Sequence, residues 1–240
     1  KKFYHKFIDS LVIEGASAVH LLSNLELKES RKWIKNKNKI VINNGIEIHP
    51  KKNNNKEIIS KPIKLIQIGR IHPQKNNLEL IKALMRFSED EFILDIFGPV
   101  DDYEYFKKCK ELLYSYNSQN INFQGYLDNK LIKKIYFEYD LLCMPSLVEA
   151  SSVVLIEAFS CGLPALISHE VGTSKEILQY KAGLISGTSF DSIYLSLDKI
   201  RKEPLILKQL SLNAEKLCSE KYNSISNCKN LISYYKKLIN

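Results

Sequence analysis

Several features that would assign a protein class at once are scarce in this 240-residue sequence. No apolar run approaches the roughly 18 residues of a membrane-spanning helix, because charges interrupt the Leu, Ile and Val positions every few residues. The five cysteines are odd in number and widely scattered, which favours reduced core thiols over disulfides or metal ligation. The start lacks an initiator Met and the apolar region of a secretory signal. We therefore expect a soluble, cytoplasmic chain that is a piece of a longer polypeptide.

The composition supports a folded core and favours anionic partners. Hydrophobic residues make up 45% of the sequence, and the formal net charge is +8. Such a charge suits nucleic acid, acidic lipid headgroups or a phosphorylated substrate, although lysines spread over helix faces often only keep a protein in solution. The sequence contains no recognised nucleic-acid-binding module, so we expect no nucleic-acid partner.

From Lys64 onward, short β-branched runs alternate with longer segments whose apolar positions lie three and four residues apart. This alternation is typical of βαβ units and predicts an α/β fold with a doubly wound parallel sheet. The predicted strands span 64–69, 92–97, 121–124, 141–144, 164–168 and 183–186. The predicted helices between them lie near 76–88, 102–116, 129–138, 152–161 and 173–179.

The flanking segments have a different character. Two further strands, 18–23 and 39–48, are predicted around a helix, and the polar stretch 49–62 is expected to be a linker or exposed loop. After about residue 189 the sequence predicts two or three amphipathic helices, one of which begins near Pro204.

The segment from Pro145 to Ser168 is the most informative for function. A strand ends at Met144, a turn of small residues follows, and a helix is expected to start near Ser151 or Ser152. A helix that begins at the carboxyl end of a parallel strand directs free N–H groups at its ligand, and phosphate suits that position. Glu149 and Glu157 lie eight residues apart, roughly 12 Å along a helix, which fits a diphosphate-linked sugar at one end and a ribose at the other.

These residues resemble a known family. Glu149, seven intervening residues, Glu157, Ala158 and CGLP at 161–164 resemble the E-x7-E signature of glycosyltransferase family 4, whose retaining enzymes have the GT-B fold. Four more segments resemble family motifs in the right order: IGRIHPQKNNLELIKAL (68–84), INFQGYLDN (121–129), VGTSKEI (171–177) and VINNGIEI (41–48). The resemblance covers roughly residues 17–190 and implies the Rossmann-like C-terminal, donor-binding domain of a GT-B enzyme.

The resemblance also implies residue roles. Arg70 and Lys75 would clamp the donor diphosphate, Glu149 would contact the sugar hydroxyls beside the anomeric carbon, and Glu157 would hold the ribose hydroxyls. Cations and N–H dipoles suit a leaving diphosphate, because negative charge builds on its oxygens. The other residues predicted to bind the donor are Gly69, Ala150, Ser151, Ser152 and Val153.

No metal or other cofactor is expected, because the sequence has no Asp-x-Asp motif, and neither Asp101 nor Asp102 is given a ligand role. Simpler roles stay open at this stage. Arg70 could only pair with a neighbouring acid, Glu149 could only favour a helix N-terminus, and Glu157 could face solvent.

The match departs from the family pattern at several places, one of which is a turn glycine that is Thr173 here. The usual E-G-F-G becomes Glu149 followed by Ala150, Ser151 and Ser152, so the sugar preference does not carry over. The glycine that commonly follows the phosphate-binding lysine is Asn76, a residue type that tolerates left-handed backbone conformations.

The resulting hypothesis divides the chain into four parts. Residues 1–50 would be a remnant of an N-terminal acceptor domain with its linker strand, 51–62 a linker, 63–190 the Rossmann-like nucleotide-sugar-binding domain, and 191–240 the C-terminal helices. The expected function is a hexosyltransferase, incomplete as an isolated chain, that moves a sugar with retention from a UDP- or GDP-sugar to a glycan or lipid-linked acceptor in polysaccharide biosynthesis. Lipid-linked acceptors would add peripheral contact with the acidic inner face of the cell membrane. The rival hypotheses are a non-catalytic donor-binding subunit that needs a separate acceptor-domain chain, and a GT-B sugar-nucleotide epimerase.

Overall fold

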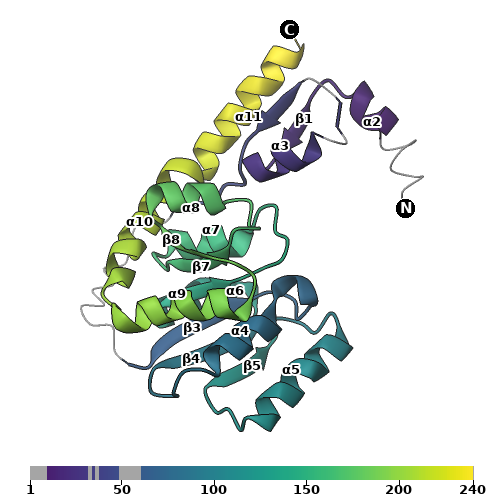
Figure 1. The fold of residues 1–240 in the computed structure, drawn as a ribbon. Coiled ribbons are helices and arrows are strands. Elements are labelled where there is room, and N and C mark those ends of the chain that lie inside the picture. Colours follow the sequence, from purple (N-terminus) through teal and green to yellow (C-terminus); the bar gives the residue numbers. More distant parts are fainter. Residues whose placement is uncertain (1–9, 32–33, 36–37, 49–60, 240) are drawn as a thin grey trace.

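A six-stranded parallel sheet forms the centre of the protein in the computed structural model, which describes residues 10–31, 34–35, 38–48 and 61–239 (Figure 1). The strand order is β5, β4, β3, β6, β7, β8, and every neighbouring pair is parallel. The strands are β3 (Ile63–Ile68), β4 (Phe92–Phe97), β5 (Ile121–Gly125), β6 (Leu141–Met144), β7 (Ala165–Ser168) and β8 (Gly183–Ser186). The six predicted strands and the doubly wound arrangement are thus confirmed.

The order of the strands reverses between β3 and β6. From β3 the chain winds outward through β4 to β5, and it then returns to the other side of β3 to form β6, β7 and β8. In open parallel sheets, ligands bind at the carboxyl ends of the strands beside such a switch point. The loops that follow β3 and β6 are therefore the first place to look for a site.

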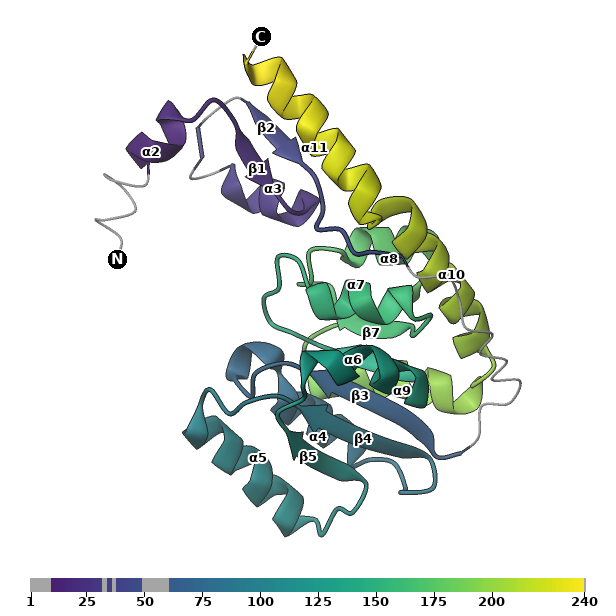
Figure 2. The ribbon, with the colours of Figure 1, turned by 180° about the vertical axis from the view of Figure 1, so that it is seen from behind.

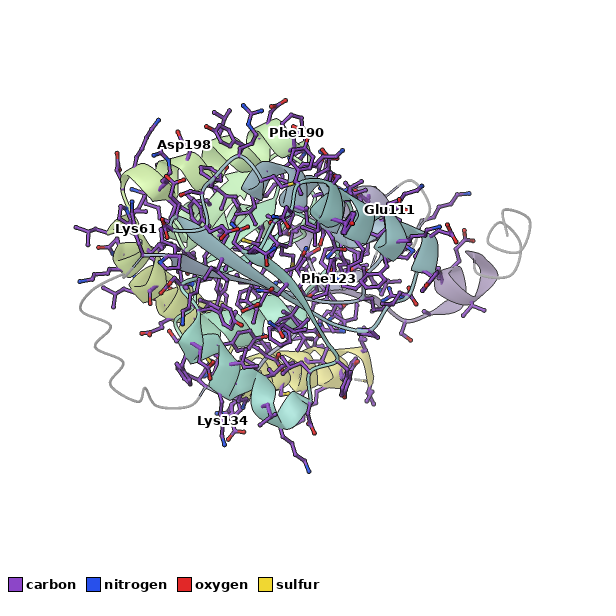
Figure 3. The ribbon with its side chains drawn as sticks, turned by 90° about the horizontal axis from the view of Figure 1, so that it is seen from below. Lys61, Glu111, Phe123, Lys134, Phe190 and Asp198 are labelled. Atoms are coloured by element: carbon purple, nitrogen blue, oxygen red, sulfur yellow. The ribbon has the colours of Figure 1, made fainter. Side chains whose placement is uncertain are left out.

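Helices cover both faces of the sheet. One hydrophobic cluster packs α4 (Asn77–Leu84), α5 (Tyr103–Ser115) and α9 (Phe190–Lys202) on one face, and a second packs α6 (Asn129–Ile135), α7 (Val153–Ser160) and α8 (Ser174–Tyr180) on the other. Figure 3 shows the two layers end on, with Phe190 and Asp198 of α9 on one side and Lys134 of α6 on the other. Because successive strand residues point to opposite faces, Leu65 belongs to the first cluster and Ile66 to the second.

Several predicted elements are shorter than expected, including the strand predicted at 18–23, of which only residues 19–21 form a strand. The helix predicted at 76–88 is a 3-10 turn, η2 (Pro73–Lys75), followed by α4, which ends at Leu84. It stops there because Phe87 N–H bonds back to the Leu84 carbonyl at 3.0 Å, which tightens the chain out of the α-helical pattern. The strand predicted at 39–48 forms a ladder only over β2 (Lys39–Val41), since its partner β1 (Val19–Leu21) offers only three residues.

A small unit precedes the main sheet. It consists of α2 (Ser10–Gly15) and of β1 and β2, which pair in parallel around α3 (Asn24–Ser30). Figures 1 and 2, seen from opposite sides, both place the last helix, α11 (Ser224–Ile239), alongside this unit. Asn227 Nδ2 of α11 donates to the Asn43 carbonyl at 3.0 Å, which ties the helix to the segment after β2. Of the linker predicted at 51–62, all but residues 61 and 62 lies outside the described residues.

The C-terminal part is helical, as predicted. After α9 come α10 (Ile206–Lys221), which begins two residues after Pro204, and α11. Within the described ranges, no helix is both long enough and apolar enough to cross a membrane. Cys109, Cys143 and Cys218 are buried free thiols, as their apolar surroundings in the sequence indicate.

The loop after β3 lies directly against the end of β4, and Gly98 allows this contact. Its φ is +144°, and a Cβ on it would lie 1.9 Å from the Gly69 carbonyl oxygen. We expect Gly98→Ala to lower the free energy of unfolding by about 3 kcal/mol, because neither backbone segment can move aside. Urea unfolding measures this change. Gly15→Ala is the control, since a Cβ there meets nothing within 4 Å, and a loss below ~1 kcal/mol for Gly98→Ala would contradict the expectation.

Candidate functional site

Backbone hydrogen bonds join the loops that follow β3, β6 and β7 at the carboxyl edge of the sheet. Leu147 N–H donates to the Gln74 carbonyl at 2.8 Å, which joins the loops after β6 and β3. Gly172 N–H donates to the Glu149 carbonyl at 2.7 Å, and Glu149 and Val171 form an isolated parallel bridge. Glu149 therefore lies in a fixed backbone frame rather than in a free loop.

Lys75 and Glu149 form an ion pair in this frame, through Lys75 Nζ and Glu149 Oε2. Both side chains are largely buried, with exposed fractions of 21% and 16%. Lys75 ends η2, and its side chain runs over Gly69, where an added Cβ would lie 3.3 Å from Lys75 Cε. The structure thus brings together two of the three residues predicted to be catalytic, and Gly69 lies against the Lys75 side chain.

Arg70 has a different partner. Its Nη1 lies 2.8 Å from Asp101 Oδ2, and both side chains are well exposed, at 57% and 39%. This is the pairing with a neighbouring acid that the sequence left open as the simpler role. Asp101 follows β4, the strand next to β3, so Arg70 lies at the same edge of the sheet as Lys75.

The helix after Glu149 begins as predicted. Ser152 is the N-cap of α7, with extended backbone, and its Oγ accepts a hydrogen bond from Leu155 N–H at 3.4 Å. Val153 is the first helical residue, and the first-turn N–H groups of a helix have no partner within the helix. The Ser151 Oγ accepts from Asn44 Nδ2 at 3.4 Å, and the Ala150 carbonyl packs against Gly172. The positive end of the α7 dipole therefore lies four residues after Glu149 in the chain.

Glu157 lies one turn into α7, and its side chain contacts Tyr136 of η3 (Tyr136–Glu138). Its Oε2 accepts a hydrogen bond at 3.3 Å from the hydroxyl of Tyr136, a side chain only 1% exposed. Burial raises the pKa of Glu157, and the Tyr136 hydrogen bond and the nearby Lys133 charge partly oppose that rise. The ribose-binding role assigned to Glu157 stays a prediction.

Glu157→Gln is expected to raise stability at neutral pH. Since the folded-state pKa lies above the ordinary 4.5, the stability that the carboxyl group contributes is lost as the pH rises through that folded value. The glutamine variant should be more stable than the parent at pH 7, by less than about 1 kcal/mol because the carboxylate is only partly buried. The difference should vanish near pH 4. Thermal unfolding at both values measures this, and an equal difference at the two would contradict the assigned cause.

Sequence reasoning missed three residues around the site. Asp101 was given no role, although it pairs with Arg70, and Tyr136 and Gln67 were not singled out at all. Gln67 Nε2 donates to the Lys75 carbonyl at 2.9 Å from inside β3. A glutamine between apolar residues in the second half of β3 was the available signal for Gln67. Among the described residues, no group of three or more His, Cys, Asp and Glu side chains could hold a metal ion.

Comparison with known proteins identifies a family for the chain. The family model described as Glycosyl transferases group 1 matches residues 49–217. An uncharacterised glycosyltransferase of Methanocaldococcus jannaschii is 27% identical over 178 residues, which cover 72% of this chain and 44% of the relative. An uncharacterised 41.2 kDa protein in the cps region of Klebsiella pneumoniae is 25% identical over 186 residues, which cover 74% of this chain and 49% of the relative. The chain thus spans just under half the length of these curated relatives.

Solved structures share the fold at low identity. Sucrose-phosphate synthase of Thermosynechococcus elongatus superimposes on all of this chain with a TM-score of 0.86 at 19% identity, over 62% of its own length. HepE of Anabaena in complex with UDP-glucose gives 0.83 at 15% identity, over 96% of this chain and 66% of its own. The C-terminal domain of a group 1 glycosyl transferase from Francisella tularensis gives 0.65 at 18% identity, over 75% of this chain and 99% of its own. With its family match over more than half the sequence and its six-stranded parallel sheet, the chain belongs to the group 1 glycosyl transferases and contains the Rossmann-like domain of the GT-B fold.

Proposed function

We propose that this chain is the donor-binding portion of a retaining hexosyltransferase of glycosyltransferase family 4. The observation that carries the proposal is the Lys75 and Glu149 ion pair at the carboxyl edge of the sheet, directly before the N-terminus of α7. An ammonium group and a set of free helix N–H groups suit a diphosphate, and a carboxylate suits sugar hydroxyls. HepE of Anabaena, a neighbour in fold, has been crystallised with UDP-glucose, which supports a nucleotide-sugar donor here.

In the proposed reaction, the bond between the anomeric carbon and the diphosphate oxygen breaks, a bond to an acceptor hydroxyl oxygen forms, and the proton of that hydroxyl passes to the departing diphosphate. Negative charge grows on the departing diphosphate, where Lys75, Arg70 and the first N–H groups of α7 stabilise it. Arg70 becomes available when the diphosphate replaces Asp101 as its partner, which costs little because exposed ion pairs are weak. Glu149 orients the sugar, and Glu157 holds the ribose. No metal takes part in this scheme.

The acceptor side is proposed to lie in another α/β unit. Residues up to 50 are proposed to be the end of an N-terminal acceptor domain, 51–62 its linker, 63–190 the donor-binding domain and 191–240 the C-terminal helices. The short parallel pair of β1 and β2 supports this division, since parallel sheets are ordinarily larger and covered on both faces. We propose a glycan or lipid-linked acceptor, a role in polysaccharide biosynthesis, and a cytoplasmic site of action that includes contact with acidic lipid.

Calorimetric titration of the chain with UDP-, GDP- and ADP-sugars tests the proposal. We expect one UDP- or GDP-sugar to bind with a dissociation constant in the range of about 1 μM to 1 mM, typical of enzyme substrates. The same titration with Lys75→Ala should show much weaker binding. If no nucleotide sugar of the panel binds, the donor-binding function is wrong.

A further inference from the structure

Asn76 occupies the turn between η2 and α4, directly after the lysine of the proposed donor site. Its backbone is left-handed, with φ 58° and ψ 33°, and its side chain is almost fully buried, at 5% exposed. Glycine adopts this conformation most readily, and asparagine is among the few other residues that do so. Glycine would therefore allow the left-handed backbone conformation equally well. The presence of a buried side-chain amide at this position needs a separate explanation.

The Asn76 amide joins two other loops of the sheet edge. Its Nδ2 donates to the Pro145 carbonyl at 3.0 Å and to the Thr188 carbonyl at 2.7 Å. Pro145 starts the loop after β6 that carries Glu149, and Thr188 lies in the loop between β8 and α9. Because a side-chain amide has two N–H hydrogens, both carbonyls can be bonded at once.

Two further buried side-chain amides, those of Gln67 and Asn77, connect the Lys75 backbone to β3. Gln67 Nε2 donates to the Lys75 carbonyl, and Asn77 Nδ2 donates to Gln67 Oε1 at 2.8 Å. Gln67 and Asn77 are 3% and 1% exposed, so these bonds lie away from solvent, where unmade hydrogen bonds are costly. The Lys75 backbone is therefore fixed to β3 on one side and, through Asn76, to the loops after β6 and β8 on the other.

We propose that Asn76 is a positioning residue that sets Lys75 against Glu149 by tying the loops after β3, β6 and β8 into one rigid frame. The inference rests on the proposed function of Lys75 as the diphosphate ligand. The amide reaches the Glu149 loop at Pro145, four residues before the carboxylate, and the Leu147 to Gln74 backbone bond closes the same link. Loss of the amide would let the loops separate and would leave the ammonium misplaced for a bound diphosphate.

The test is a double-mutant cycle on the affinity for UDP, or for GDP if only GDP binds, measured by calorimetry on the whole chain. Asn76→Gly removes the amide and keeps the left-handed backbone, so it should fold. We expect it to weaken binding roughly fivefold, and to have less than a twofold effect when Lys75 is already alanine, because contacts that act through one group are not additive. Asn117→Gly is the matched control: Asn117 is also left-handed, at φ 49°, but lies exposed after α5, so affinity should not change.

The outcomes separate this inference from the function on which it rests. If Lys75→Ala leaves the affinity unchanged, the proposed role of Lys75 is wrong, and the inference falls with it. If Lys75→Ala weakens binding but Asn76→Gly does not, the function stands and the positioning role is wrong. Equal weakening by Asn76→Gly in both backgrounds would show a general structural effect and would also overturn the positioning role.

Discussion

Replacement of Glu149 by glutamine is expected to lower donor turnover by about 10²–10³-fold, the scale on which lost transition-state hydrogen bonds and charges act. The carboxylate is largely buried and its loop is held in a backbone frame, so it is already positioned for the sugar once the diphosphate replaces it as the partner of Lys75. Glutamine keeps the shape of the side chain and removes its charge. Steady-state release of nucleoside diphosphate by the full-length protein measures the loss.

The same substitution should not weaken the binding of the free nucleoside diphosphate, because it leaves Lys75 without a competing carboxylate. Glu170→Gln is the control, since Glu170 lies in the adjoining loop and pairs with His169 at 2.9 Å. Turnover by that variant should stay near the parent value. Turnover by Glu149→Gln within about threefold of the parent would remove Glu149 from the catalytic set.

Lys75→Ala is expected to weaken the binding of UDP or GDP roughly 30-fold or more, because truncation of one member of a buried charge pair commonly costs at least 2 kcal/mol. Two effects add in this variant. The diphosphate loses its ammonium partner. The Glu149 carboxylate is left unpaired close to the proposed diphosphate position, where it repels the diphosphate. Calorimetry measures the change, and the affinity for the bare nucleoside should stay the same, because a nucleoside carries no phosphate.

Lys82→Ala serves as the matched control for charge. Lys82 lies on α4, shortly after the site, and pairs with Glu79 at 2.6 Å. Its loss removes one positive charge from the same region without touching the proposed site. Should both variants weaken binding equally, the effect would come from overall charge, and Lys75 would have no specific role.

Much of the fold could be predicted because its signals are local. Each strand from β3 to β8 is a short apolar run followed by a turn and a helical pattern, and a βαβ order determines a parallel sheet. The start of α7 could also be predicted, since serine is one of the residue types preferred at helix N-caps. The helix after Lys75 was placed too long because its end depends on a turn from Ala83 to Phe87 whose composition is compatible with a helix.

The site was predictable only as far as its motifs go. The order of the motifs indicated that Lys75 and Glu149 belong to one site, and the structure joins them in an ion pair. The sequence left open which acid Arg70 would pair with, and it could not predict Asp101, since the two residues lie in loops that follow different strands. For Asn76 the sequence indicated only a residue type that tolerates a left-handed backbone. The contacts of its amide could not be predicted, because both acceptor carbonyls lie about 70 or more residues away along the chain.

The most direct test of the account is a crystal structure of the chain with whichever of UDP, GDP and ADP binds most tightly. The account predicts diphosphate oxygens within hydrogen-bonding distance, about 2.7–3.2 Å, of Lys75 Nζ and of the first backbone N–H groups of α7. Glu149 should then face the position that the sugar would occupy. A diphosphate bound elsewhere, with Lys75 still paired only with Glu149, would contradict the central claim.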